Sequence, residues 1–313
     1  MFSYVLRRIL QSIPILFVVL TLVFVVVRVL PGDPAVAALG DYATREAVQA
    51  LREKMGLDAP LWLQYFRFLG SLLHGDLGKS IVTGYPVWNQ VMEVLPHTLE
   101  LTFFGILFGY VCGVPLGIVA AVRRNSFLDY FNRVFSLVGL SVPAFYLGIL
   151  LILLLCIQFP FFPVVGAGSF SDPAENLRHV FLPALTLGLL MTAYITRMTR
   201  SSILETIRED YVRTAKAKGV LDRVVLYKHV LRNALIPIVA LGSLYAVTLI
   251  GSSVMVEIVF SRPGLGKLMV GAIKQRDYTT LQSVMVIYAV IVVLFNLATD
   301  LVYSLIDPRI KYK

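Results

Sequence analysis

Six long apolar runs constrain this chain more than any other feature of its sequence. A helix rises about 1.5 Å per residue, so roughly 20 residues cross the hydrocarbon of a bilayer. The runs are continuous rather than alternating, which favours helices over barrel strands. We therefore predict an all-α, polytopic membrane protein with six transmembrane helices. They are Ile9–Val27, Leu101–Val122, Val134–Gln158, Val180–Thr196, Leu235–Val256 and Tyr278–Thr299, the fourth being the shortest.

The positive charges indicate the topology of the protein. The chain has 28 lysines and arginines, 19 acidic residues and a net charge of +9. If the N-terminus lies inside, most of the basic residues fall in inside segments, at 7–8, 123–133, 197–232 and 309–313. This placement predicts cytoplasmic N- and C-termini in a bacterial inner membrane and needs no nucleic-acid partner.

The first span is predicted to be retained rather than removed as a signal peptide. Ala35-Val-Ala37 resembles a cleavage site, but the apolar core is long for a signal peptide. Arg28 and the segment Pro31-Gly-Asp-Pro34 also interrupt the approach to that site.

The outside loop 31–97 is too long for a simple connector. Thr44–Met55 has the pattern of a helix, and Pro60–Leu69 repeats aromatic residues at helical spacing. Trp62 and Tyr65 suit a helix in the membrane interface. The loop either caps the bundle or receives a soluble partner.

A later outside segment, 258–281, also has two interpretations. Pro263 and Gly264 predict a turn, with Arg262 before it and Arg276-Asp277 beyond it. These residues form either an ordinary turn or part of an outer gate.

The inside loop 197–234 is longer than topology alone requires. Ser201–Lys218 has a helical pattern, Gly219 is expected to stop it, and Asp222 is a predicted N-cap for a second helix through Asn233. Either the loop only fixes topology, or it is a docking element. We favour docking, because the inside loop 123–133 shows how short such a connection can be.

Catalytic, cofactor and metal sites are not predicted. Gly75-Asp-Leu-Gly78-Lys79-Ser80 lacks the first glycine of a phosphate-binding loop, because position 73 is Leu73. The four histidines have no zinc spacing. Cys112 and Cys156 lie in apolar runs and are expected to pack there as free thiols. The ionisable residues near span ends are expected to reach the interface; they are Arg28, Glu100, Glu257 and Asp300.

A set of short motifs carries a family resemblance over essentially the whole chain. The motifs are Leu30-Pro-Gly-Asp-Pro34, Gly75-Asp-Leu-Gly78, Arg197-Met-Thr-Arg-Ser-Ser202, Asp210-Tyr-Val-Arg-Thr-Ala-Lys-Ala-Lys-Gly219, His229-Val-Leu-Arg-Asn-Ala-Leu-Ile-Pro237, Arg262-Pro-Gly-Leu-Gly266, Arg276-Asp-Tyr278 and Asp307-Pro-Arg309. Together they resemble the inner-membrane permeases of bacterial dipeptide, oligopeptide and nickel ABC importers.

The resemblance implies a type I, MetI-like permease fold. Residues 1–97 would form an N-terminal transmembrane helix with an ordered periplasmic loop. Residues 98–313 would form a five-helix core with a cytoplasmic coupling loop at 197–234. The loop is similar to the family pattern Glu-Ala-Ala, three residues, Gly, but only Ala215 and Gly219 match it. Its coupling residues would be Asp210, Tyr211, Arg213, Thr214, Ala215, Lys216, Ala217, Lys218 and Gly219.

The resemblance also implies partners. They are a second homologous permease, two cytoplasmic ATPases that hold ATP and Mg, and a periplasmic or lipid-anchored substrate-binding protein. Trp62, Tyr65, Arg262, Pro263, Gly264, Arg276 and Asp277 would be candidates for partner contact or an outer gate. The expected cargo is a peptide, with nickel complexes, glutathione or another small solute as alternatives. An ion-coupled secondary transporter and a membrane-embedded hydrolase are competing hypotheses with weaker support in the residues.

Overall fold

The computed structural model describes residues 2–29, 34–39, 44–158 and 162–306, and it is helical throughout those ranges apart from turns and loops. The chain divides into two compact units. The larger is built mainly from His97–Arg262, and the second consists of Leu6–Pro96 and Pro263–Leu294.

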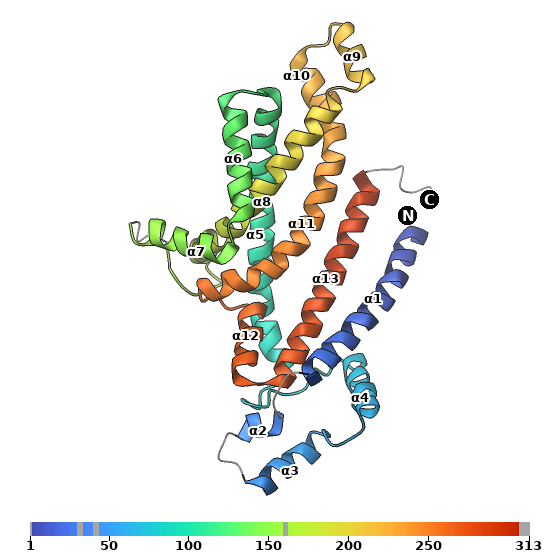
Figure 1. The fold of residues 1–313 in the computed structure, drawn as a ribbon, viewed down its shortest axis with the longest axis vertical. Coiled ribbons are helices and arrows are strands. Elements are labelled where there is room, and N and C mark those ends of the chain that lie inside the picture. Colours follow the sequence, from blue (N-terminus) through green and yellow to red (C-terminus); the bar gives the residue numbers. More distant parts are fainter. Residues whose placement is uncertain (1, 30–33, 40–43, 159–161, 307–313) are drawn as a thin grey trace. The chain divides into compact units, whose positions relative to one another are not determined.

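Long helices dominate both units (Figure 1). They are α1 (Phe2–Val29), α5 (Val87–Val122), α8 (Pro173–Thr206), α11 (Leu231–Val259) and α13 (Tyr278–Ile306). The shorter helices are α2 (Pro34–Leu39), α3 (Arg45–Lys54), α4 (Leu61–Leu73), α6 (Phe127–Ser141), α7 (Ala144–Leu151), α9 (Asp210–Ala217), α10 (Asp222–Val224) and α12 (Leu265–Gln275). Two π-helical segments are η1 (Ile152–Cys156) and η2 (Val225–Val230).

The predicted spans are confirmed in number, with one exception to their form. Within the described ranges, 5 helices are long and apolar enough to cross a membrane, or up to 6 if one bent pair counts as a span. That pair is Phe127–Ser141 with Ala144–Cys156, bent by 108°. The predicted span Val134–Gln158 is therefore not one continuous helix.

Proline explains the bend. Pro143 has no N–H to donate, and its ring disfavours helical geometry in the residue before it. Val142 is accordingly extended, with φ −86° and ψ 126°. Pro143 lies inside the apolar run and indicates a kink there, but hydropathy does not show how sharp the bend is.

The inside loop differs from its prediction at both helices. α8 continues to Thr206, three residues turn the chain, and α9 starts at Asp210, so Ser201–Lys218 is not one helix. The turn lets α9 bury Val212 and Ala215 in the core of the larger unit, which explains why the helix breaks there. Asp222 is the first residue of α10 and not its N-cap, which is Leu221.

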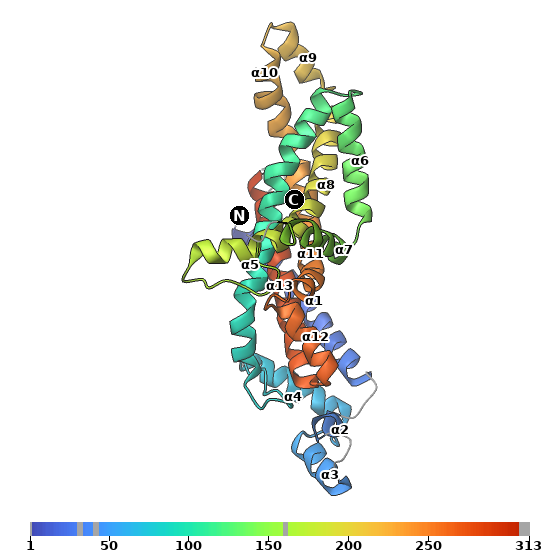
Figure 2. The same cartoon turned by 90° about the vertical axis from the view of Figure 1, so that its left-hand side faces the viewer.

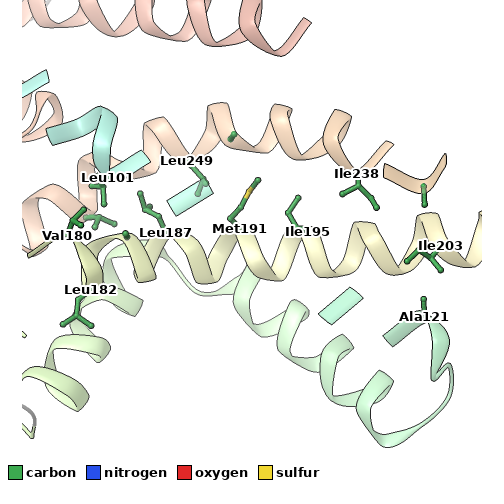
Figure 3. Close-up of a cluster of buried hydrophobic side chains, with 14 of the residues drawn as sticks. Leu101, Ala121, Val180, Leu182, Leu187, Met191, Ile195, Ile203, Ile238 and Leu249 are labelled. Carbon is green, nitrogen blue, oxygen red and sulfur yellow. The ribbon is translucent and has the colours of Figure 1, made fainter. Parts of the chain in front are cut away.

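Helix α8 is the centre of the larger unit, with α6, α7 and α11 packed against it. α6 runs beside α8 in both views (Figures 1 and 2). Figure 3 shows Leu187, Met191 and Ile195 in a row along α8, with Leu249 and Ile238 on α11 facing them.

Glycines on α5 allow it to approach α8 closely. A Cβ added at Gly105 would lie 2.9 Å from the Cβ of Leu187, and one at Gly113 would lie 2.7 Å from the Cβ of Ile195. Gly109 and Gly117 repeat the contact at Met191 and Thr199. Small residues four apart are the usual means by which membrane helices pack at short distance.

The second unit contains the predicted helices of loop 31–97. Thr44 caps α3 by accepting a hydrogen bond from the N–H of Ala47, at 3.3 Å. In α4, Tyr65 packs edge-on against Phe24 of α1, with ring centroids 5.2 Å apart. The predicted aromatic face is therefore divided, because Trp62 is 64% exposed while Tyr65 is half-buried.

Two elements of this unit were not predicted. α2 follows the first span, and α12 fills much of the segment 258–281 that the sequence predicted as a turn. α12 contributes Leu265 to a small core with Leu77, Val87, Val91 and Val284.

Candidate functional site

Helix α9 presents most of its length to solvent. Val212 is 1% exposed and Ala215 is 8% exposed, and these two residues anchor the helix. The exposed residues are Asp210, Tyr211, Arg213, Thr214, Lys216 and Ala217, followed by Lys218. The structure thus brings the predicted coupling residues together on one short helix, of which one side is held and the other is free to contact a partner.

A left-handed glycine ends α9. Gly219 has φ +76°, and its N–H donates to the carbonyl of Lys216 at 2.9 Å. The next N–H, of Val220, reaches back to the carbonyl of Ala215 at 3.3 Å. These two bonds form the Schellman arrangement, in which a residue with a Cβ is strained at the glycine position.

Side chains connect α9 to the helix that follows. Asn233 donates to the hydroxyl of Tyr211 at 2.7 Å. Lys216 pairs with Asp222 at 3.2 Å, although both side chains are more than half exposed. α9 is therefore connected to α10 and α11 as well as to α8. Both of the long helices, α8 and α11, are predicted spans.

The larger unit also holds a buried ionic cluster that the sequence did not predict. Arg262 is fully buried and pairs with Glu100, which also accepts a hydrogen bond from Asn176. Glu257 is fully buried too, and Thr98 donates to its carboxylate at 2.7 Å. The expectation of a side chain at the membrane interface is therefore wrong for Glu257, whereas the Glu100 side chain stays partly exposed.

Burial lowers the pKa of the Arg262 guanidinium, and the nearby carboxylates of Glu100 and Glu257 oppose that shift. A buried charge is tolerated only where it is paired, and this cluster provides the pairing. The spacing of Glu100, Asn176 and Arg262 along the chain carries no local signal, so only the tertiary structure reveals the cluster.

A second buried pair joins α6 to α8. Asp129 is fully buried and accepts two hydrogen bonds from the guanidinium of Arg200, at 2.6 and 2.9 Å. Asp129 also accepts from the N–H of Asn125, so the pair orders the short connection before α6. Asp129 precedes the run that we assigned from Val134, and Arg200 follows the run that ended at Thr196, so neither residue stood out as a charge inside a predicted span.

The predicted gate residues have several environments. Trp62 and Tyr65 lie in α4, which is distant in sequence from the predicted turn at Pro263 and Gly264. Pro263, Gly264 and Asp277 line one cavity of about 380 Å³ in the second unit. Arg276 follows α12 in a left-handed conformation, with φ 55°.

Asp277 has a structural environment within this unit. It is 3% exposed and accepts hydrogen bonds from the hydroxyls of Ser80 at 2.5 Å and Thr280 at 2.7 Å. The last residue of the segment that resembled a phosphate-binding loop, Ser80, thus donates a hydrogen bond to the Asp277 carboxylate. A carboxylate repels phosphate, so this segment is not a phosphate site.

Metal-ligating groups are not clustered in the part of the chain that the structure describes, because no three His, Cys, Asp or Glu side chains lie together in a suitable arrangement. Cys112 and Cys156 are free thiols, as predicted.

The fold and the α9 segment define a class of protein: a polytopic helical membrane protein with a short amphipathic helix beside the ends of its spans. Residues 113–312 match the family described as binding-protein-dependent transport system inner membrane component, and residues 1–102 match the N-terminal part of such components. The chain belongs to this family of ABC importer permeases.

Relatives of full length agree with that assignment. The chain is 39% identical over 333 residues to the dipeptide transport system permease protein DppB of Alkalihalophilus pseudofirmus, with both chains wholly covered. It is 40% identical over 313 residues to the glutathione transport system permease protein GsiC of Escherichia coli strain K12, again with full coverage of both.

Solved structures confirm the predicted fold class. A chain of the inward-facing MetNI methionine ABC transporter matches with a TM-score of 0.57 and 23% identity, covering 69% of this chain and 96% of that one. A chain of an amino acid ABC transporter crystallised with histidines matches with a TM-score of 0.53 and 16% identity, covering 69% and 93%. The all-α, MetI-like permease fold is thus confirmed.

Proposed function

We propose that this permease subunit forms half of the translocation pathway of an ATP-driven importer, and that α9 is the point at which ATP hydrolysis acts on it. The exposed face of α9 is the observation that carries the proposal. A short helix fixed by two buried residues, with its remaining side chains in solvent, suits docking into a cleft of a cytoplasmic ATPase.

The partners follow from this role. Two ATPase subunits would hold the ATP and Mg, and a second, homologous permease would complete the pathway. The N- and C-termini would lie in the cytoplasm, as the distribution of lysine and arginine favours. The division at residue 97, with a first span and outer loop preceding a permease core, belongs to the same proposal.

Movement would pass from α9 into the spans through packed contacts. The bond from Asn233 to Tyr211 joins α9 to α11, and Val212 is part of the core around α8. Packed helices switch between discrete arrangements rather than deforming smoothly, so displacement of α9 would carry both spans with it.

The cargo is proposed to be a peptide or a peptide-like solute. The relatives named above carry names for dipeptide and glutathione transport, and both solutes contain peptide linkages. A periplasmic or lipid-anchored binding protein would deliver the cargo. Trp62, Tyr65, Arg262, Pro263, Gly264, Arg276 and Asp277 remain the candidates for contact with it or for an outer gate.

Replacement of Gly219 tests the coupling role. We expect Gly219→Val to reduce ATP-dependent uptake by about tenfold or more in the reconstituted complex, because a β-branched residue in the left-handed region costs about 1–3 kcal/mol. The measurement is uptake of a labelled dipeptide or of glutathione into vesicles, together with substrate-stimulated ATP hydrolysis.

Gly75→Val is the matched control. Gly75 has φ +72°, follows α4 as Gly219 follows α9, and like Gly219 has open space around its Cα. Gly75→Val introduces the same backbone strain in loop 31–97 instead of the inside loop, so its uptake should stay near that of wild type. Full uptake by Gly219→Val, with normal assembly, would contradict the coupling role.

A further inference from the structure

A cavity of about 680 Å³ lies in the larger unit, between the ends of two spans and the segment that follows α9. α5 contributes Ala121 and Val122, and the end of α8 contributes Leu204 and Ile207. α10 and η2 supply much of the remaining wall. Its volume is within the range of small-molecule sites, about 300–1,000 Å³.

The cavity has an apolar interior. Ala121 is 3% exposed, Val225 is 2% exposed and Val230 is fully buried. Leu204, Ile207 and Leu226 complete that surface and are half-buried. An occupant must therefore have an apolar portion that can pack against this interior. A small hydrophilic anion has no such portion.

The rim of the cavity is cationic. Arg124, Arg208 and Arg223 line it, and all three side chains are exposed. Within the ranges that the structure describes, no carboxylate pairs with any of the three. Lys216 also lines the cavity, but Asp222 compensates its charge at 3.2 Å, which leaves an excess of three positive charges.

One wall of the cavity is formed where a predicted span ends. Val122 is the last residue of α5, and Ile207 follows the last residue of α8. The predicted span of α5 ends at Val122, which places Arg124 at the depth of the headgroups, whereas α8 continues past Thr196, where its predicted span ends, and carries Ile207 to the cavity.

From this combination we infer that the cavity is a binding site for an anionic phospholipid. Its phosphate contacts Arg124, Arg208 and Arg223, and the upper part of an acyl chain lies against Ile207 and Leu226. A guanidinium offers paired N–H donors that match phosphate oxygens, and basic pockets at helix ends bind anionic headgroups for this reason. The inference relies on the proposed function only for assigning the site to the cytoplasmic leaflet.

The test is lipid retention by the full-length subunit, measured by native mass spectrometry with phosphatidylglycerol and phosphatidylcholine vesicles as lipid sources. We expect selective retention of phosphatidylglycerol. Arg124→Gln, Arg208→Gln and Arg223→Gln should each weaken it about fivefold, the effect of one basic residue near an anionic surface. Because the three arginines are exposed, these variants are expected to fold.

Three further variants separate charge from general damage. Arg232→Gln removes an exposed arginine of α11 that does not line the cavity, and it should retain the lipid as wild type does. A triple Arg→Lys variant at 124, 208 and 223 keeps the charge but lacks the paired guanidinium donors, so its loss of binding should be smaller than that of a triple Arg→Gln variant. Ile207→Trp, which fills the interior with every cation in place, should lose the lipid.

Several outcomes would overturn the inference. Equal retention of the two lipids would show that no site exists here. So would a loss of phosphatidylglycerol in Arg232→Gln as large as the loss in the cavity variants. Displacement by glycerol 3-phosphate at the concentration of the lipid would assign the site to a soluble organophosphate. Release of the lipid on adding the ATPase subunits would make the cavity part of that interface. The comparison of lipids and of variants uses the subunit alone, so its result does not depend on the outcome of the Gly219→Val uptake test.

Discussion

At the scale of single residues, the charges buried in the larger unit carry the most specific information. Asp129 and Arg200 form a two-bond pair between α6 and α8, and Arg262 pairs with Glu100 beyond the end of α11. Charges in such positions are costly unless they are satisfied. Each pair therefore acts as a fixed connection between helices that apolar contacts alone would position less uniquely.

Removal of the Asp129 carboxylate is expected to destabilise the subunit. Asp129→Asn leaves the Arg200 guanidinium without its counter-ion, and breaking a buried pair typically costs about 3–5 kcal/mol. The measurement is thermal unfolding of the purified protein.

The control for that change is Asp210→Asn. Asp210 pairs with Arg213 at 3.5 Å, but its side chain is almost wholly exposed. Exposed pairs contribute little, so the melting temperature should hardly change. Similar melting temperatures for wild type, Asp210→Asn and Asp129→Asn would show that the buried pair is not a stabilising connection.

At the scale of elements, the glycines of α5 decide how two long helices pack. The row Gly105, Gly109, Gly113 and Gly117 faces α8 along three helical turns. A spacing of four in an apolar run is visible in the sequence, and this signal would have paired α5 with a neighbour. Which neighbour it is depends on the tertiary structure.

Gly113→Ala is expected to weaken this packing. The added methyl group would lie 2.7 Å from the Cβ of Ile195 and 3.1 Å from the carbonyl of Thr192, so the two helices must separate. Overpacking of this kind costs about 1–3 kcal/mol, which thermal unfolding of the purified subunit will detect.

Gly251→Ala is the matched control for Gly113→Ala. Gly251 lies in α11, is exposed and has no atom within 4 Å of an added Cβ. Alanine in an open helical position stabilises by about 0.5–1 kcal/mol. The two substitutions should therefore shift the melting temperature in opposite directions, and a loss of stability in both would contradict the packing explanation.

At the scale of the whole molecule, the arrangement of lysine and arginine predicts which side each segment faces. Loop 31–97 and the α9 segment are separated along the chain by an odd number of predicted spans. They should therefore lie on opposite sides of the membrane.

Cysteine labelling tests this orientation. We expect Lys54→Cys in α3 to react with a membrane-impermeant maleimide in intact cells, and Lys218→Cys to react only after the membrane is opened, because both side chains are exposed but face opposite compartments. The unsubstituted chain controls for Cys112 and Cys156. Labelling of Lys218→Cys in intact cells would reverse the proposed topology.

The sequence by itself determined the class of this protein and the residue at which α9 ends. Hydropathy depends on composition alone, so the spans could be predicted without any knowledge of packing. The glycine after Lys218 likewise ends α9 through local backbone geometry. Each of these signals is contained within one continuous stretch of the chain.

Only the tertiary structure decided the size of the bend at Pro143, the turn between α8 and α9, and the buried charges around Arg262. The turn exists because Val212 and Ala215 find a core to enter, and Arg262 is stable because Glu100, distant in sequence, lies beside it. Such features depend on which residues meet in space, and that information is not present in any local stretch of the chain.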